Sequence, residues 1–198
     1  MQAASGRRCF GDGDPLFERY HDEEWGFPVI DERGLLERLS LEAFQSGLSW
    51  RTILARREGF RAAFAGFQPD VLLGYGAAEV ERLLTDTSII RNRRKIEATL
   101  ANARATVALR AAGVPLETLV RSHAPERQER APATWGDVPS TTPESVALTR
   151  ELKSRGFRFV GPTTSYALMQ ACGLVNDHLA GCPIRTVVEQ ARQEAGLI

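Results

Sequence analysis

Hydrophobic residues along the chain recur at the spacing of one helix face. Ile53, Phe60 and Phe64 lie at i, i+7 and i+11, which predicts a helix over residues 53–64. A second series at i, i+4, i+7 and i+11 predicts another helix and consists of Ile96, Leu100, Ala103 and Val107. The chain shows no alternating strand of convincing length and no internal repeat. These patterns predict an all-α fold.

Capping residues predict where one C-terminal helix begins and ends. Thr141 and Glu144 have the spacing of a capping box, and Pro143 would lie in the first turn. Gly156 should end this helix after Arg155.

Residues 152–173, LKSRGFRFVGPTTSYALMQACG, then read as helix, short turn, helix. Gly161–Pro162 should begin the second helix, which should end near Gly173. Residues 122–143 contain four prolines and are predicted to form a loop. We expect one unit over residues 1–198, in which this loop could separate two helical lobes.

Composition describes an ordinary globular chain. Its 198 residues are 43% hydrophobic and 25% charged, with a formal net charge of zero, so nucleic-acid binding must rest on local patches. No run approaches 18 apolar residues, and the start, MQAASGRR, lacks the apolar segment of a signal peptide. We therefore expect a cytoplasmic protein without a membrane span.

Positive charge gathers around the turn of the predicted hairpin. Gly156 and Gly161 let the backbone approach a partner closely, and the second helix would begin with exposed amides that suit a phosphate oxygen. Arg155, Arg158 and Lys153 add positive charge beside those amides. This arrangement resembles the helix-hairpin-helix element, which holds the DNA backbone without recognising its sequence. An ordinary αα-hairpin with a glycine cap remains the alternative.

Cysteine and histidine residues pair near both ends of the chain. His178 and Cys182 are four residues apart, so one helical turn would place both on one face. Together with Cys9 and His21 they form a Cys2His2 set suited to tetrahedral zinc, although a buried thiol and unrelated histidines would give the same pattern. Three cysteines exclude a four-cysteine iron–sulfur site, and Cys172 is expected in the core.

Several segments resemble the type I 3-methyladenine DNA glycosylases and span nearly the whole chain in order. They are DPLFERYHDEEWG (14–26), LEAFQSGLSW (41–50), IIRNRRKIEATLANARA (89–105) and KSRGFRFVGPTTSYALMQACGLVNDHLAGC (153–182). The resemblance implies a helix-hairpin-helix enzyme of base-excision repair that hydrolyses the N-glycosidic bond of 3-methyladenine in double-stranded DNA. It also implies one structural zinc, held by Cys9, His21, His178 and Cys182, that joins the two ends of the chain. We expect the protein to act as a monomer.

The same resemblance implies a base pocket formed by Glu42, Tyr20 and Trp50. Glu42 would accept hydrogen bonds from the extruded base and act as the catalytic residue, while the aromatic rings favour a cationic alkylated base over neutral adenine. Trp25 is expected in the core or the pocket wall. No lysine lies in the matched pocket segments, which predicts a monofunctional enzyme without strand cleavage.

The chain departs from the family pattern at two aromatic positions. The family commonly has Trp shortly after the first zinc cysteine, whereas this chain has Phe10 and Gly11 there. Phe17 stands where the family sometimes has an aromatic hydroxyl. A separate difference is Asn176, which stands where related helix-hairpin-helix glycosylases have a catalytic Asp. Base recognition is therefore expected to differ in detail, and a strong general base is not expected.

Two other classes of protein share some of these features. A zinc-containing DNA-binding module without activity could use the same hairpin, but it would not need Glu42 beside Tyr20 and Trp50. A metal-dependent phosphohydrolase is suggested by His21–Asp22, but such sites need more than the three histidines of this chain.

Overall fold

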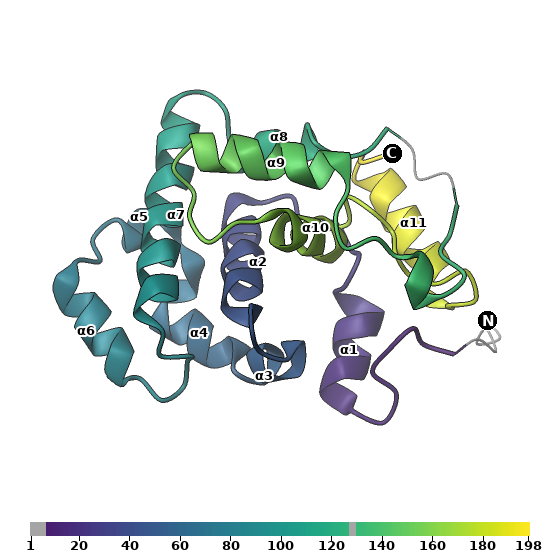
Figure 1. The fold of residues 1–198 in the computed structure, drawn as a ribbon, viewed down its shortest axis with the longest axis horizontal. Helices are drawn as coiled ribbons and strands as arrows, with labels where there is room; N and C mark the ends of the chain where they lie inside the picture. The colour runs from purple at the N-terminus through teal and green to yellow at the C-terminus, as the bar shows by residue number, and fades with distance from the viewer. Residues whose placement is uncertain (1–6, 127–129) are drawn as a thin grey trace.

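The chain folds into helices joined by short connections (Figure 1). A computed structural model describes residues 7–126 and 130–198, and within those ranges it contains no β-strand. The helices are α1 Pro15–Glu23, α2 Glu32–Gln45, α3 Trp50–Ala55, α4 Arg57–Ala63, η1 Ala65–Phe67, α5 Pro69–Leu72, α6 Ala77–Thr85, α7 Arg93–Ala111, α8 Leu116–Arg121, η2 Trp135–Asp137, α9 Pro143–Ser154, α10 Pro162–Ala171 and α11 Ile184–Glu194. The all-α prediction is confirmed.

Helix α2 forms the centre of the molecule. It packs against α3, α7, α8, α10 and η1, and Figure 1 shows it enclosed by α7 and α10. Every residue from 35 to 44 is buried, including the polar residues Glu37, Arg38, Ser40 and Glu42. Burying polar groups on a central helix costs free energy unless they have partners, so these residues indicate either buried ion pairs or a ligand site.

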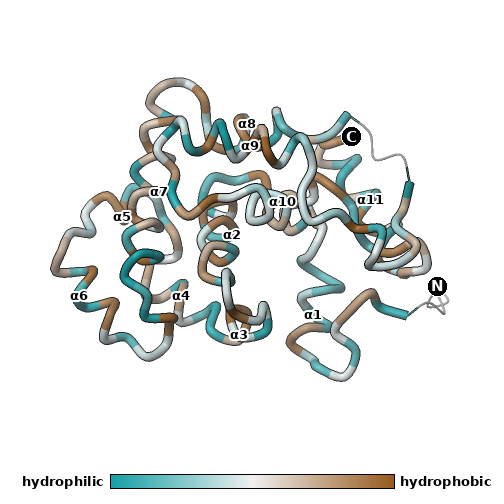
Figure 2. Tube along the Cα trace, viewed as in Figure 1, coloured by the Kyte–Doolittle hydropathy of each residue, from teal (hydrophilic) through white to brown (hydrophobic). Residues whose placement is uncertain are grey.

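Two hydrophobic clusters surround α2. One stacks Phe44, Phe60, Phe64 and Phe67 between α2, α4 and η1, with ring centroids 4.6–6.4 Å apart. The other lies where α8, α9 and α10 meet, and it includes Cys172, which is fully buried as predicted. Hydrophobic and hydrophilic residues alternate along most helices, as amphipathic helices around a shared core require (Figure 2).

The prediction of one continuous helix over residues 53–64 is wrong, because the structure has two helices there. The chain leaves helical geometry at Arg56, with φ −103° and ψ 4°, so α3 and α4 are separate helices. The Arg56 guanidinium donates to the carbonyl of Thr87 at 2.6 Å, and Arg57 pairs with Glu24 at 2.8 Å. These tertiary contacts redirect the chain while the predicted apolar residues still reach the core.

The predicted capping box is displaced by one residue. Thr142, not Thr141, is the N-cap of α9, and its partner is Ser145 rather than Glu144. The Thr142 amide donates to Ser145 Oγ at 2.9 Å, and the Ser145 amide donates to Thr142 Oγ1 at 3.2 Å. Pro143 occupies the first turn as expected.

The remaining boundaries follow the glycine and proline signals. Helix α9 has Arg155 as its C-cap, and Gly156 adopts φ 89°. Helix α10 begins at Pro162 and ends at Ala171, two residues before Gly173. The segment between α8 and α9 is a loop apart from η2, and its residues 127–129 lie outside the described residues. No helix within residues 7–126 and 130–198 has the length and hydropathy needed to cross a bilayer.

Candidate functional site

The structure brings the four predicted metal ligands into one cluster. The ligand atoms of Cys9, His21, His178 and Cys182 all lie within 4.8 Å of one another. Cys182 Sγ is 3.4 Å from His21 Nε2 and 3.5 Å from His178 Nδ1, and Cys9 Sγ is 3.7 Å from His178 Nδ1. Tetrahedral zinc with these ligands would separate neighbouring ligand atoms by roughly 3.3–3.8 Å. The donor set and these three separations therefore fit zinc.

Neighbouring groups orient both imidazoles for metal binding. His21 Nδ1 lies 2.7 Å from Asp22 Oδ1, which leaves Nε2 facing the cysteines. His178 Nε2 lies 2.9 Å from the Trp25 carbonyl, which leaves Nδ1 facing them. Burial lowers the pKa of His178 to about 4, so its imidazole is neutral, as a metal ligand must be.

The cluster connects segments from opposite ends of the sequence. Cys9 precedes α1 and Cys182 precedes α11, and Figure 1 shows the N-terminal segment running beside the C-terminal region. His178 and Cys182 lie in turns rather than on the helical turn predicted for them. The Leu179 amide donates to Cys9 Sγ at 3.1 Å, which places the first cysteine against this turn.

A cavity of ≈380 Å³ opens beside this cluster and contains the predicted base-binding residues. Its wall brings together Tyr20 from α1, Glu42 from α2 and Trp50 from α3. The remaining lining residues are Phe10, Phe17, Trp25, Gln45, Trp135, Thr163, Ala167 and Gln170. Most of this surface is aromatic, and these lining residues include one carboxyl group and no lysine.

Glu42 is the acidic group of the cavity. Its side chain is 8% exposed, and burial raises its pKa to about 8, while the positive charge of Arg38 acts in the opposite direction. Arg38 lies one helical turn before Glu42 and donates to Glu24 at 3.0 Å. Its guanidinium carbon is also 5.7 Å from the centre of the Tyr20 ring. The cavity therefore contains a carboxyl group that is largely protonated at neutral pH.

Aromatic rings form a continuous surface along the cavity. The Tyr20 and Trp50 centroids are 5.4 Å apart, and Phe10 lies 6.4 Å from Tyr20 and 5.2 Å from Trp25. Phe10 lines the cavity, whereas the neighbouring Gly11 does not. Trp50 Nε1 is buried and has no hydrogen-bond partner among the described residues, which is rare for an indole N–H outside a ligand site.

Asn176 and Asp177 both lie away from the cavity surface. Asn176 is fully buried and donates to the Arg185 carbonyl at 3.0 Å and to Glu189 at 2.9 Å. Asp177 accepts hydrogen bonds from Tyr166 Oη at 2.6 Å and from Gln170 Nε2 at 2.8 Å. Asp177 therefore orients the cavity residue Gln170, and Asn176 has a structural position.

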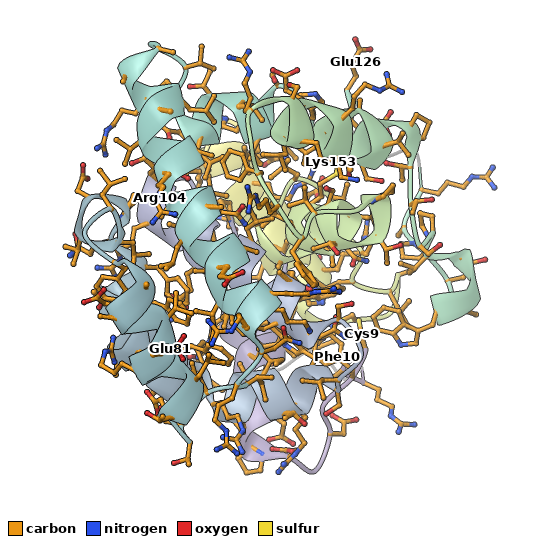
Figure 3. The ribbon with its side chains drawn as sticks, turned by 60° about the vertical axis from the view of Figure 1, so that its left-hand side comes forward. Cys9, Phe10, Glu81, Arg104, Glu126 and Lys153 are labelled. Atoms are coloured by element: carbon orange, nitrogen blue, oxygen red, sulfur yellow. The ribbon has the colours of Figure 1, made fainter. Side chains whose placement is uncertain are left out.

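The turn between α9 and α10 exposes the residues predicted to contact DNA. Phe157 and Val160 are buried and anchor the turn, while Arg155, Gly156 and Arg158 are exposed. Asn102 holds the backbone of Arg158 on both sides, accepting from its amide at 2.7 Å and donating to its carbonyl at 3.2 Å. The Arg155 guanidinium also pairs with Glu151 at 2.9 Å. Lys153 projects from the neighbouring end of α9 (Figure 3).

The backbone conformation favours glycine at position 156 but not at position 161. Gly156 has φ 89°, a conformation that favours glycine. Gly161 is the N-cap of α10 with φ −140°, which any residue adopts, and a side chain there would meet no atom within 4 Å. Neither conformation nor packing within the described chain requires glycine at 161, and no side chain caps the exposed amides of α10.

Sequence reasoning missed several residues of the site. Gln45 could have been found, because it lies three residues after Glu42 on the same helix face. Trp135 and Gln170 reach the cavity only through the tertiary fold. Arg38 gave no sequence signal, since a charged residue on a helix is normally exposed.

Comparisons with known proteins agree with this architecture. The methyladenine glycosylase family model matches residues 10–186. DNA-3-methyladenine glycosylase 1 of Escherichia coli (strain K12) is 46% identical over 170 residues, covering 85% of this chain and 91% of that protein. DNA-3-methyladenine glycosylase of Haemophilus influenzae is 41% identical over 174 residues, covering 86% and 93%.

Solved structures show the same agreement in three dimensions. A crystal structure of 3-methyladenine DNA glycosylase I superimposes with a TM-score of 0.86 at 46% identity, covering 89% of this chain and 98% of that one. A 3-methyladenine DNA glycosylase I from Staphylococcus aureus, solved to explain its recognition of 3-methyladenine, gives a TM-score of 0.85 at 31% identity. It covers 93% of this chain and 98% of its own.

Proposed function

Because the chain belongs to the methyladenine glycosylase family, we propose that it excises 3-methyladenine from alkylated DNA during base-excision repair. The observation that carries the proposal is the aromatic cavity around Glu42, in a chain that aligns with 91% of the Escherichia coli enzyme. A DNA-binding module without activity would have no use for a buried acid among aromatic rings. A metal held by all four residues of the Cys2His2 cluster would have no open position for the chemistry of a phosphohydrolase.

Charge provides the discrimination between damaged and normal adenine. Methylation of adenine at N3 makes the nucleotide cationic. A cation beside Glu42 lowers the pKa of the Glu42 carboxyl group, which then ionises. The resulting charge-assisted hydrogen bond contributes roughly 1.5–3 kcal/mol. Neutral adenine would instead meet a protonated, buried acid. Tyr20 and Trp50 add stacking faces that favour a cation.

The positive charge of the base also makes it a good leaving group. A water molecule attacks the sugar C1′, the N-glycosidic electron pair moves onto the base, which leaves as neutral 3-methyladenine, and the water loses its extra proton to solvent. The base must first leave the helical stack, at a cost of a few kcal/mol. We infer that Glu42 acts by charge rather than as a strong base, and that the enzyme, without a lysine among the cavity residues, leaves the strand intact.

The turn between α9 and α10 is proposed to be a helix-hairpin-helix element that holds the backbone of double-stranded DNA. The uncapped amides of α10 and the exposed Arg155 and Arg158 suit phosphate oxygens. Gly161, which the fold itself does not require, allows the DNA backbone to approach closely. Such contacts are independent of sequence, as expected for an enzyme that searches DNA for damage. We expect it to act as a monomer.

Zinc is proposed as the resident metal of the Cys9, His21, His178 and Cys182 cluster. With four protein ligands the site is closed, so the metal would stabilise the fold rather than take part in the reaction. His178 also contacts Trp25, with ring centroids 4.6 Å apart, so the metal would fix one wall of the cavity.

Single-turnover release of 3-methyladenine tests the role of Glu42. Glu42→Gln keeps the shape but removes the charge, so release should fall about 10- to 100-fold, at about 1.4 kcal/mol per tenfold change. Glu42→Ala should be slower still, because it leaves the edge of the base unpaired. Affinity for an undamaged duplex should stay constant, because phosphate contacts dominate it. Release by Glu42→Ala at the wild-type rate would remove Glu42 from the site, and an equal loss of plain-duplex binding would make its role structural.

A further inference from the structure

Trp135 lies in the cavity wall although it belongs to the long loop between α8 and α9. It is 44% exposed, among the largest exposed apolar side chains of the described residues. Among the described residues of this loop, Trp135 alone lines the cavity that contains Glu42. Hydrophobic burial alone does not explain a tryptophan that remains nearly half exposed.

Three sets of hydrogen bonds hold Trp135 in place. Asp137 accepts from the Thr134 amide at 2.8 Å, from Thr134 Oγ1 at 3.0 Å and from the Ala133 amide at 3.1 Å, which closes the short η2 turn. The Ala180 amide donates to the Pro132 carbonyl at 2.8 Å, beside the turn that contains His178 and Cys182. Trp135 Nε1 donates to the Cys9 carbonyl at 3.0 Å. The indole is therefore oriented before any ligand arrives.

The indole also extends the aromatic surface of the cavity. Its centroid lies 6.1 Å from Phe10, at an interplanar angle of 44°, and 6.1 Å from Trp25, at 51°. Phe10 in turn contacts Tyr20, so the rings run from Trp50 to Trp135 without interruption. Figure 3 shows Phe10 next to Cys9, the residue whose carbonyl anchors the indole.

We propose that Trp135 is a specificity-determining residue whose indole face stacks on the extruded alkylated base. The inference rests on the proposed function, because it assigns a second wall to the same pocket. A rigid indole provides stacking area at little cost in conformational entropy, and its face attracts a cationic purine more than a neutral one. The alternative is that Trp135 merely covers Cys9 and stabilises the metal cluster.

Two substitutions separate these roles. Trp135→Phe keeps an aromatic face but loses the N–H donor to Cys9, whereas Trp135→Leu keeps apolar bulk without an aromatic face. Val187→Ala is the control, since Val187 is 50% exposed on α11 and does not line the cavity. Each variant is tested for binding of free 3-methyladenine by calorimetry, for single-turnover base release, for bound metal and for melting temperature.

Stacking predicts a graded result. Trp135→Leu should weaken binding of 3-methyladenine about 10-fold and slow its release at subsaturating enzyme, with metal content and melting temperature unchanged. Trp135→Phe should recover most of the affinity, within about threefold of wild type. Plain-duplex affinity should not change in either variant.

Each of the following results would overturn the proposal. Equal affinity of Trp135→Leu and wild type for 3-methyladenine would remove Trp135 from the pocket. Loss of metal in both variants, in proportion to their loss of activity, would show that the Cys9 contact is its role. If wild type itself released no 3-methyladenine, the proposed function would fail; if wild type released the base and the variants did so equally well, only the assignment of Trp135 would fail.

Discussion

At the scale of single residues, Glu42 stands out because its environment opposes its charge. It lies on the central helix with 8% exposure, and its pKa rises to about 8 from an ordinary value of 4.5. Such a buried carboxyl group does not stabilise the fold by itself, and its charged form becomes favourable when a positive ligand binds beside it. The buried Arg38, one turn earlier, is already engaged with Glu24 and the Tyr20 ring, so it moderates the cost without removing it.

The first prediction concerns stability against pH. Between about pH 4.5 and 8 the folded protein holds a proton on Glu42 that the unfolded chain has released, so stability falls as pH rises through this window. Glu42→Gln cannot ionise and should lose this decline, becoming more stable than wild type by roughly 2–5 kcal/mol at pH 9 and by little at pH 5. Urea unfolding at several pH values measures this difference, with the exposed Glu23→Gln as control. Parallel profiles for Glu42→Gln and wild type would contradict a buried, titrating carboxyl group.

The second prediction concerns activity against pH. Only the ionised carboxylate pairs with the cationic base, so kcat/KM for 3-methyladenine release should rise with pH up to about 8, by about tenfold per pH unit well below that value. Glu42→Gln should show no such rise. Release rates at subsaturating enzyme from pH 5.5 to 9 provide the measurement, and a wild-type rate that is constant over this range would be inconsistent with the raised pKa.

At the scale of helices, local signals predicted some boundaries and missed others. Gly156 and Pro162 predicted the turn between α9 and α10, because the backbone preferences of these two residues are intrinsic. The break at Arg56 was missed, because apolar spacing is the same for one long helix and for two short helices with a common buried face. Its causes are ion pairs and hydrogen bonds to residues more than 30 positions away in the sequence, which no local pattern contains.

The third prediction concerns the turn between α9 and α10. Charge reversal at Arg155 or Arg158 should weaken binding to every duplex by a similar factor and reduce the salt slope by about one per lost phosphate contact. Arg121→Glu, on the exposed end of α8, should leave binding unchanged. Titrations of two unrelated duplexes at several salt concentrations measure both quantities. A variant that altered the preference between the two duplexes would instead indicate contacts with bases.

At the scale of the whole molecule, the Cys9, His21, His178 and Cys182 cluster connects the two ends of the chain. Residue type and spacing were enough to propose the set, because few side chains bind zinc and the chain has only three histidines and three cysteines. The base pocket was harder to predict from the sequence. Without the family motif, Glu42 would be interpreted as an exposed carboxylate on a helix. Trp135 and Gln170 depend on how distant loops and helices meet, which sequence spacing does not encode.

The fourth prediction concerns that cluster. Purified protein should contain one zinc per chain, and Cys182→Ala or His178→Ala should lose it. Because metal binding to such a site is coupled to folding, a chelator should lower the melting temperature of wild type and have little effect on either variant. Cys172→Ser, a buried cysteine outside the cluster, is the control and should retain the metal. A metal-free wild-type protein with unchanged stability would exclude a structural zinc.

The most direct test of the whole account is mass spectrometry of the bases that the wild-type protein releases from methylated double-stranded DNA. The expected result is free 3-methyladenine, with undamaged adenine retained and the sugar–phosphate strand uncut until the abasic product is treated with alkali. Release of no alkylated base by a folded, DNA-binding protein would contradict the account. Strand cleavage by the purified protein alone would contradict its monofunctional mechanism.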